Sequence, residues 1–303
     1  MRPIKGDFFS IMFHYVRPSE VSNLKYLNLN KFILMLDNLM SEFGIVTQDQ
    51  WEGFRKFGKR PSGALLTFDD GLKDHFNFVA PVLKERGLFG IFYVCTDPLI
   101  NKPLSVHLSH YLLAHHDPHT IWQSLLSADS DLVWQVAKDE LAQTAYVSHN
   151  EALLIKNIKK AINWLPYNSD REQLILEIFR ELSKLSFQEF VSQWYLNEKE
   201  ISLLSMLGFE IGSHTCSHRL LSRLDLRDIR YELNESKSAL ENVSTNSIRS
   251  FCFPYGGERS YNKEILEELK KSQYSDAFSV KSSVIGKEST FELHRFDCNF
   301  FLP

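Results

Sequence analysis

The segment Leu65-Leu66-Thr67-Phe68-Asp69-Asp70-Gly71 joins an apolar run to two adjacent carboxylates and a glycine. This pattern is typical of a buried β-strand that presents acidic side chains at its carboxyl end, the edge at which α/β folds build their sites. Two neighbouring aspartates at low dielectric repel each other unless a cation or a proton gives them different roles. One aspartate as a metal ligand and the other as a general base is therefore one interpretation. A strand end with an Asx-turn or a helix cap is the other.

A second apolar run, Phe209-Glu210-Ile211-Gly212-Ser213, leads into His214-Thr215-Cys216-Ser217-His218. Histidines four positions apart can lie on one side of a helical turn. Two imidazoles and one carboxylate form a ligand set that leaves positions for water, as in catalytic rather than structural zinc sites. The alternative is a pair of histidines that form ordinary hydrogen bonds at a strand end.

The third segment, Arg249-Ser250-Phe251-Cys252-Phe253-Pro254-Tyr255-Gly256-Gly257, runs from an aromatic strand pattern into a turn. Such a turn can direct backbone N–H groups into a site. Taken alone, the segment is also explained as a plain strand and turn.

In this order the three segments resemble the motifs of the polysaccharide deacetylase family, with the fold of the nodulation-type chitooligosaccharide deacetylases of carbohydrate esterase family four. TFDDG is similar to the first motif of the family, HTCSH to its H-[ST]-x-x-H motif and RSFCFPYG to its R-x-F-x-x-P-Y-G motif. The resemblance covers residues 8–100 and 205–303 and implies a distorted, incomplete (β/α) barrel. Ile11–Pro18, which contains His14, is similar to the opening strand of a bacterial subgroup.

The resemblance implies a role for most of the motif residues. Asp70, His214 and His218 would bind a divalent metal ion, most simply Zn²⁺, with Fe²⁺, Co²⁺ or Ni²⁺ as alternatives. Asp69 would act as the general base, and Arg249 would keep its carboxylate ionised and oriented. A metal-activated water molecule would thus lie beside a general base.

Two further roles follow from the same resemblance. The backbone N–H of Tyr255 would stabilise the oxyanion of the tetrahedral intermediate. The general acid of the family is commonly the histidine of a C-terminal L-x-H motif, but Leu293 and His294 are adjacent here. The family's fourth motif, an aspartate followed by tryptophans, is missing. We expect His294 to be the proton donor, with His14 and His107 as alternatives.

Alternating strand and helix patterns flank a helical middle third. Strands are expected over Phe8–Tyr15, Ala64–Phe68, Gly90–Val94, Ser250–Phe253 and Ala277–Val280, and helices over Asn30–Glu42, Asn77–Arg86, Leu226–Asn242 and Lys263–Lys271. This alternation implies parallel strands with helices outside. From about residue 101 to 207 the patterns are helical, with capping boxes at Ser148–Glu151, Ser169–Glu172 and Asn197–Glu200. We expect one catalytic domain over residues 1–303, with a helical insertion at about 101–207.

The composition excludes some classes of protein. The 303 residues carry a net charge of −4, which argues against binding nucleic acid through bulk electrostatics. No apolar run is long enough to span a bilayer, and residues 1–7 lack the apolar region of a signal peptide. The four cysteines show no C-x-x-C spacing and are expected to be free thiols of a reducing compartment. We therefore expect a cytoplasmic protein; its oligomeric state is not indicated.

Three functions remain open at this point. The first is a metal-dependent N-deacetylase that hydrolyses the acetamide of an N-acetylated sugar to amine and acetate, on a cytoplasmic glycan or a nucleotide- or lipid-linked precursor. The second is an O-acetyl esterase or a hydrolase of a non-sugar C–N bond on the same fold. The third is a sugar-binding pseudoenzyme, which is disfavoured because all the residues proposed for catalysis are present: Asp69, Asp70, His214, His218 and Arg249.

Overall fold

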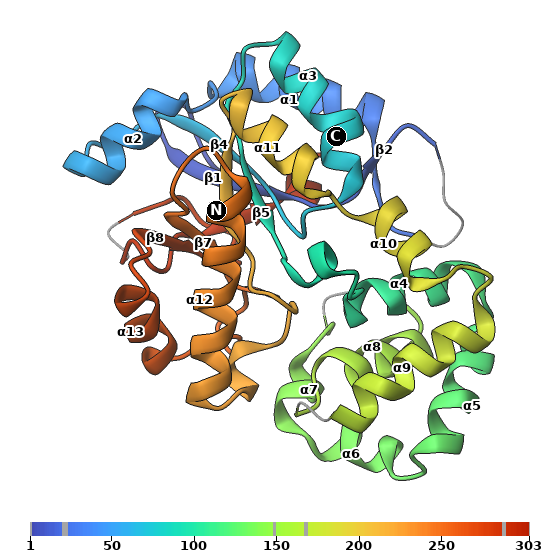
Figure 1. The fold of residues 1–303 in the computed structure, drawn as a ribbon. Helices are drawn as coiled ribbons and strands as arrows, with labels where there is room; N and C mark the ends of the chain where they lie inside the picture. The colour runs from blue at the N-terminus through green and yellow to red at the C-terminus, as the bar shows by residue number, and fades with distance from the viewer. Residues whose placement is uncertain (1, 20–23, 148–149, 167–168, 287–288, 303) are drawn as a thin grey trace. The chain divides into compact units, whose positions relative to one another are not determined.

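The computed structural model describes residues 2–302 except for 20–23, 148–149, 167–168 and 287–288. The chain divides into two compact units (Figure 1). The first comprises Met1–Ser19, Tyr26–Ile100 and Gln193–Pro303, and the second comprises Asn101–Ser192 with the short segment that ends at Lys25.

A seven-stranded parallel sheet forms the centre of the first unit. Its strands are β1 (Phe8–Phe13), β4 (Gly63–Phe68), β5 (Ile91–Val94), β6 (Glu210–Ser213), β7 (Ser250–Cys252), β8 (Asp276–Phe278) and β9 (Arg295–Asp297), in the order β8-β7-β6-β5-β4-β1-β9. A parallel bridge between Phe278 and Leu293 links the two edges, so the sheet is nearly closed. The predicted distorted (β/α) barrel is confirmed. A smaller parallel pair is formed by β2 (Val16–Arg17) and β3 (Leu27–Asn28).

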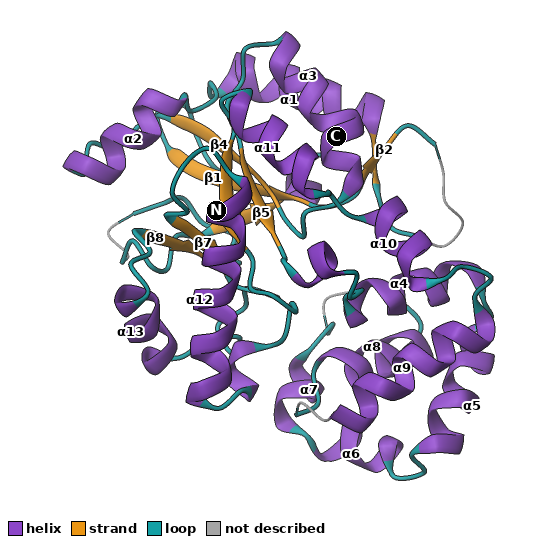
Figure 2. Ribbon diagram, viewed as in Figure 1, coloured by secondary structure: helices purple, strands orange, loops and turns teal. Residues whose placement is uncertain are grey.

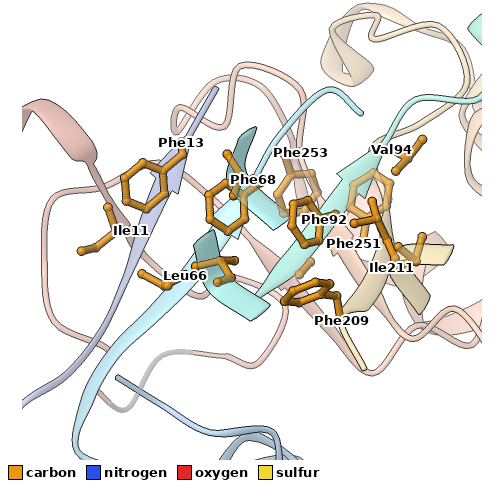
Figure 3. Close-up of a cluster of buried hydrophobic side chains, with 14 of the residues drawn as sticks. Ile11, Phe13, Leu66, Phe68, Phe92, Val94, Phe209, Ile211, Phe251 and Phe253 are labelled. Atoms are coloured by element: carbon orange, nitrogen blue, oxygen red, sulfur yellow. The ribbon is translucent and has the colours of Figure 1, made fainter. Parts of the chain in front are cut away.

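Alternation along the strands separates two cores. Residues such as Ile11, Phe68 and Phe92 face outward and form the cluster between sheet and helices shown in Figure 3, where the Phe68 ring stacks on Phe92 at a centroid distance of 4.8 Å. The intervening residues, among them Leu65 and Tyr93, fill the barrel interior. The interior-facing positions continue past the strand ends, and there they become the residues of the site.

Helices surround the sheet in the first unit. They are α1 (Leu29–Glu42), α2 (Gln48–Phe57), α3 (Ala80–Glu85), α11 (Glu198–Met206), α12 (Leu226–Val243) and α13 (Lys263–Lys271). The helix expected over Asn77–Arg86 begins two residues earlier, with a π-helical turn, η1 (His75–Val79), ahead of α3. Short 3₁₀ turns are η2 (Asp97–Ile100), η3 (Leu221–Arg223) and η4 (Cys298–Phe301).

Helix α2 closes the amino-terminal end of the barrel. Its Trp51 is fully buried, and its Arg55 donates to Asp276 Oδ2 at 2.6 Å and to Glu210 Oε1 at 2.5 Å, at the first residues of β8 and β6. Burial opposes the charge of Arg55, but the two carboxylates outweigh it and raise the pKa of its guanidinium. These buried ion pairs fix α2 across the starts of the strands.

All the secondary structure in the described residues of the second unit is helical (Figure 2). Its helices are α4 (Ser105–His115), α5 (Pro118–Ala128), α6 (Leu132–Lys138), α7 (Glu140–Thr144), α8 (Leu153–Asn163), α9 (Ser169–Leu182) and most of α10 (Phe187–Trp194). Within the described ranges, no helix combines the length and the apolarity that a membrane crossing requires.

The second unit ends at Ser192, ahead of the boundary expected near residue 207. The reason is that the next residues pack on the barrel: the backbone N–H of Leu196 donates to the carbonyl of Gly71 at 2.9 Å, and α11 contacts β6. The capping box of α11 is present, with Glu200 N donating to Asn197 Oδ1 at 3.0 Å. The capping box predicted at Ser148–Glu151 begins at residues outside the described ranges.

Candidate active site

The two aspartates lie immediately after β4. The backbone N–H of Asp69 donates to the carbonyl of Phe13 on β1 at 2.9 Å, and both carboxylates are buried. Asp70 has a φ of 79° and Gly71 one of 64°. A Cβ at Gly71 would lie 2.8 Å from Val94 Cγ1, so this turn requires glycine. The tight turn allows adjacent carboxylates to face different partners.

His214 and His218 meet through an irregular loop. The helical turn suggested by their spacing is not formed, because Thr215 and His218 have φ values of 68° and 57°. The hydroxyl of Thr215 accepts a hydrogen bond from the backbone N–H of His218 at 3.0 Å and turns the loop back on itself. The two imidazole centroids are consequently 4.9 Å apart.

Asp70, His214 and His218 form a donor set that fits a divalent metal ion. Asp70 Oδ1 lies 3.3 Å from Nε2 of each histidine, and all three side chains are buried. Two ligand atoms about 2.0–2.1 Å from a tetrahedral zinc ion are roughly 3.4 Å apart, which matches this spacing. The other ring nitrogen of His214, Nδ1, lies 2.8 Å from the carbonyl of Cys252, an arrangement that presents Nε2 to a metal ion.

Asp69 faces the barrel interior and pairs with Arg295 on β9. The guanidinium is 1% exposed and donates to Asp69 Oδ1 at 2.7 Å and to Thr67 Oγ1 at 3.1 Å. Burial alone would raise the pKa of Asp69, but the charge of Arg295 holds it below its usual value. Asp69 is therefore a buried, ionised carboxylate beside the proposed metal ligands, as a general base requires.

The assignment of Arg249 as the partner of Asp69 is wrong. Arg249 precedes β7, at the opposite end of the barrel from Asp69, and donates to the carboxylate of Glu52 on α2, including Oε2 at 3.1 Å. The motif pattern alone favoured Arg249. A signal for Arg295 was present in the sequence, because Leu293 and Arg295 alternate around His294 in an apolar C-terminal strand.

Cys252 completes the inner wall of the site. Its Sγ lies 2.9 Å from a guanidinium nitrogen of Arg295 and 3.7 Å from Asp69 Oδ2. Asp69, His214 and Cys252 are close enough to form a second possible metal group. The cation of Arg295 already contacts two of these three side chains, so a metal ion is electrostatically disfavoured there.

His14 follows β1 on the open side of Asp69. Its Nε2 is 3.9 Å from Asp69 Oδ2, and its side chain is 42% exposed. The buried ring of His75 lies 3.0 Å, through Nε2, from the backbone carbonyl of His14. Burial lowers the pKa of His75 to about 4, so His75 is neutral and its N–H can donate to that carbonyl. His75 was not singled out by its sequence context.

Comparison with family models gives a match to the polysaccharide deacetylase model over residues 58–277, more than half of the chain. The chain belongs to the polysaccharide deacetylase family. Membership supports a hydrolase that acts on acetylated sugars. No curated protein matches the sequence.

Solved deacetylase structures share the fold at low sequence identity. A deacetylase, PplD, of Streptococcus pyogenes, solved in complex with acetate, has 14% identity and a TM-score of 0.58, with 97% of this chain and 92% of that chain covered. The deacetylase domain of BpsB from Bordetella bronchiseptica has 13% identity and a TM-score of 0.57, with 98% of both chains covered. A de-N-acetylase from Aggregatibacter actinomycetemcomitans has 14% identity and a TM-score of 0.56, with 96% and 95% covered.

Tyr255 of the deacetylase lies beside the histidines. Its ring centroid is 4.8 Å from that of His218, and its φ is 64°. Gly256 has a φ of 60°, and a Cβ there would lie 2.4 Å from Val280 Cγ2. The Pro-Tyr-Gly turn thus places Tyr255 at the site through a backbone shape that needs glycine at the next position. The oxyanion role of its N–H stays a prediction.

His294 and His107 were the other two proposed proton donors. Arg295 points into the barrel, so the side chain of the preceding residue, His294, points to the other face of this extended segment. There, His294 Nδ1 is 2.6 Å from Ser283 Oγ, and the ring lines a cavity of about 310 Å³ together with Tyr261 and Val280. This placement argues against His294 as the donor. His107 is buried on α4 in the second unit, and its role stays a prediction.

Proposed function

We propose that this chain is a metal-dependent N-deacetylase of an N-acetylated sugar. The observation that carries the proposal is that the two adjacent aspartates contact different partners. Asp70 lies with two imidazole nitrogens in a set spaced for a metal ion, whereas Asp69 is held by the guanidinium of Arg295. Hydrolysis of an amide needs such a division between a Lewis acid and a base.

Each residue of the site has its own role in this reaction. A metal ion held by Asp70, His214 and His218 would acidify a water molecule and polarise the acetyl carbonyl. Asp69 accepts the proton of the attacking water, and Arg295 keeps this carboxylate charged and aimed. The backbone N–H of Tyr255 donates to the developing oxyanion.

We assign the protonation of the leaving amine to His14. Its Nε2 lies 3.9 Å from Asp69 Oδ2, and its side chain is 42% exposed. A proton donor is needed for an amine, because an unprotonated amide nitrogen is a poor leaving group.

We further propose a cytoplasmic reaction on a nucleotide-linked or lipid-linked precursor. Cys95, Cys216 and Cys252 are buried free thiols, and Cys298 is a partly buried one, which fits a reducing compartment. Zn²⁺ is the metal expected for this donor set, and Fe²⁺, Co²⁺ and Ni²⁺ suit it chemically as well.

The test compares metal content and product release in the wild type, His218→Ala and Asp69→Asn. The wild type is expected to hold stoichiometric metal and to release acetate and free amine from N-acetyl sugars. His218→Ala should lose the metal, whereas Asp69→Asn should keep it while kcat falls by about 10²–10⁴. Wild-type metal content in His218→Ala would contradict the ligand assignment. Acetate release from O-acetyl sugars alone would show an esterase.

A further inference from the structure

The loop that carries His218 rests on a buried carboxylate from another element. Glu232 on α12 is 2% exposed. Its Oε2 accepts hydrogen bonds from the backbone N–H groups of Cys216 at 2.7 Å and Ser217 at 3.0 Å, and its Oε1 accepts one from the hydroxyl of Ser217. Glutamate is rarely buried without partners, and here the partners belong to the metal-site loop.

These hydrogen bonds act at the middle of the segment that joins the two histidines. The flanking residues Thr215 and His218 have positive φ values, a strained conformation for a non-glycine residue that persists only where its surroundings impose it. On the other side of the loop, the N–H of Asp97 donates to the carbonyl of Cys216 at 2.9 Å. Cys216 is therefore held between the extension of β5 and Glu232.

Helix α12 is itself anchored to the strand that delivers His214. The hydroxyls of Ser236 and Ser213 lie 2.7 Å apart, and Ser236 Oγ donates to the carbonyl of Glu232 at 2.6 Å. Glu232 is thus fixed relative to β6, and through its carboxylate it fixes the loop relative to β6. The positions of both histidines are therefore set by the same strand, β6.

We propose that Glu232 is a positioning residue of the metal site, which holds the 215–218 loop in the conformation that brings His218 Nε2 to Asp70. The inference rests on the proposed function, because it assumes a metal ion at Asp70, His214 and His218. Without the carboxylate, the buried N–H of Cys216 and the partly buried N–H of Ser217 lose their acceptor, and the loop is free to relax its left-handed residues.

The experiment measures metal affinity by equilibrium titration of Zn²⁺ into the apo-protein. Glu232→Leu keeps the volume but removes every acceptor, whereas Glu232→Gln keeps one acceptor oxygen. Glu235, an exposed residue of the same helix, supplies the matched controls Glu235→Leu and Glu235→Gln. Loss of an outer contact to a metal ligand typically weakens metal binding by about 10–100-fold, which is the increase in Kd expected for Glu232→Leu. Glu232→Gln should lie between this value and the wild type.

A second readout separates positioning from general support of the fold. Metal should raise the Tm of the wild type and of both Glu235 variants, and this increment should shrink in the Glu232 variants. A folded Glu232→Leu protein with wild-type Kd would overturn the inference. If Glu232→Leu does not fold, a wild-type Kd in Glu232→Gln has the same consequence. A wild-type protein that binds no metal would instead refute the proposed function.

Discussion

Replacing Arg295 by methionine removes the cation that faces the proposed base. The guanidinium is 1% exposed and donates to Asp69 Oδ1 at 2.7 Å, to Thr67 Oγ1 at 3.1 Å and to Cys252 Sγ at 2.9 Å. Removing one partner of a buried ion pair costs about 3–5 kcal/mol of stability, because the remaining charge is buried without compensation. Arg249→Met breaks only the pair with Glu52, whose side chains are 38% and 20% exposed. Such a pair contributes about 0–1 kcal/mol.

Urea unfolding and kcat/KM on an N-acetyl sugar, measured on both variants, test this difference. Arg295→Met should be the less stable protein, and its kcat/KM should fall toward the loss of about 10²–10⁴ that accompanies removal of a general base. Arg295→Lys keeps a charge but not the planar fork, and should be intermediate. Arg249→Met should stay near the wild type in both measurements. If Arg249→Met loses more activity or more stability than Arg295→Met, the assignment of Arg295 is refuted.

Two other predictions concern histidines. Burial lowers the pKa of His75 from 6.5 to about 4, so the unfolded chain takes up a proton first as the pH falls. The wild type should therefore lose roughly 3 kcal/mol of stability between pH 6.5 and 4, a loss that His75→Phe should not show. If urea unfolding gives the same dependence of the free energy of unfolding on pH for both proteins, this prediction is refuted. His14→Ala should reduce kcat/KM far more for an N-acetyl sugar than for p-nitrophenyl acetate, whose leaving group needs no proton, and His294→Ala should not. A selective loss in His294→Ala alone would restore His294 as the donor.

Much of the barrel could be predicted because its strands are short apolar runs bounded by turn residues. β1, β4, β5, β7 and β8 fall within or close to the expected ranges. The helix α2 was missed, although Thr47-Gln48-Asp49-Gln50 carries a capping-box pattern that the structure bears out. Its apolar residues are few, and its role depends on strand ends far away in the sequence.

The candidate site could likewise be predicted only in part. The residues placed together by local motifs, Asp69, Asp70, His214 and His218, are close in space. The ion pair between Arg295 and Asp69 joins positions 226 apart, and the pattern around a single arginine does not specify such a partner. Alternation along the C-terminal strand does indicate that Arg295 and His294 face opposite sides. It does not indicate which of these faces looks into the barrel.

The closure of the barrel by α2 has a consequence for the path of the reaction. Trp51 packs against Phe8 and Phe278, and Arg55 spans the first residues of β6 and β8, so the amino-terminal end of the interior is filled by side chains. In the proposed reaction, substrate, water and both products would then share the carboxyl end of the barrel. If the proposed reaction is correct, acetate and the amine leave by the way the acetamide entered, and either product held there delays the next turnover.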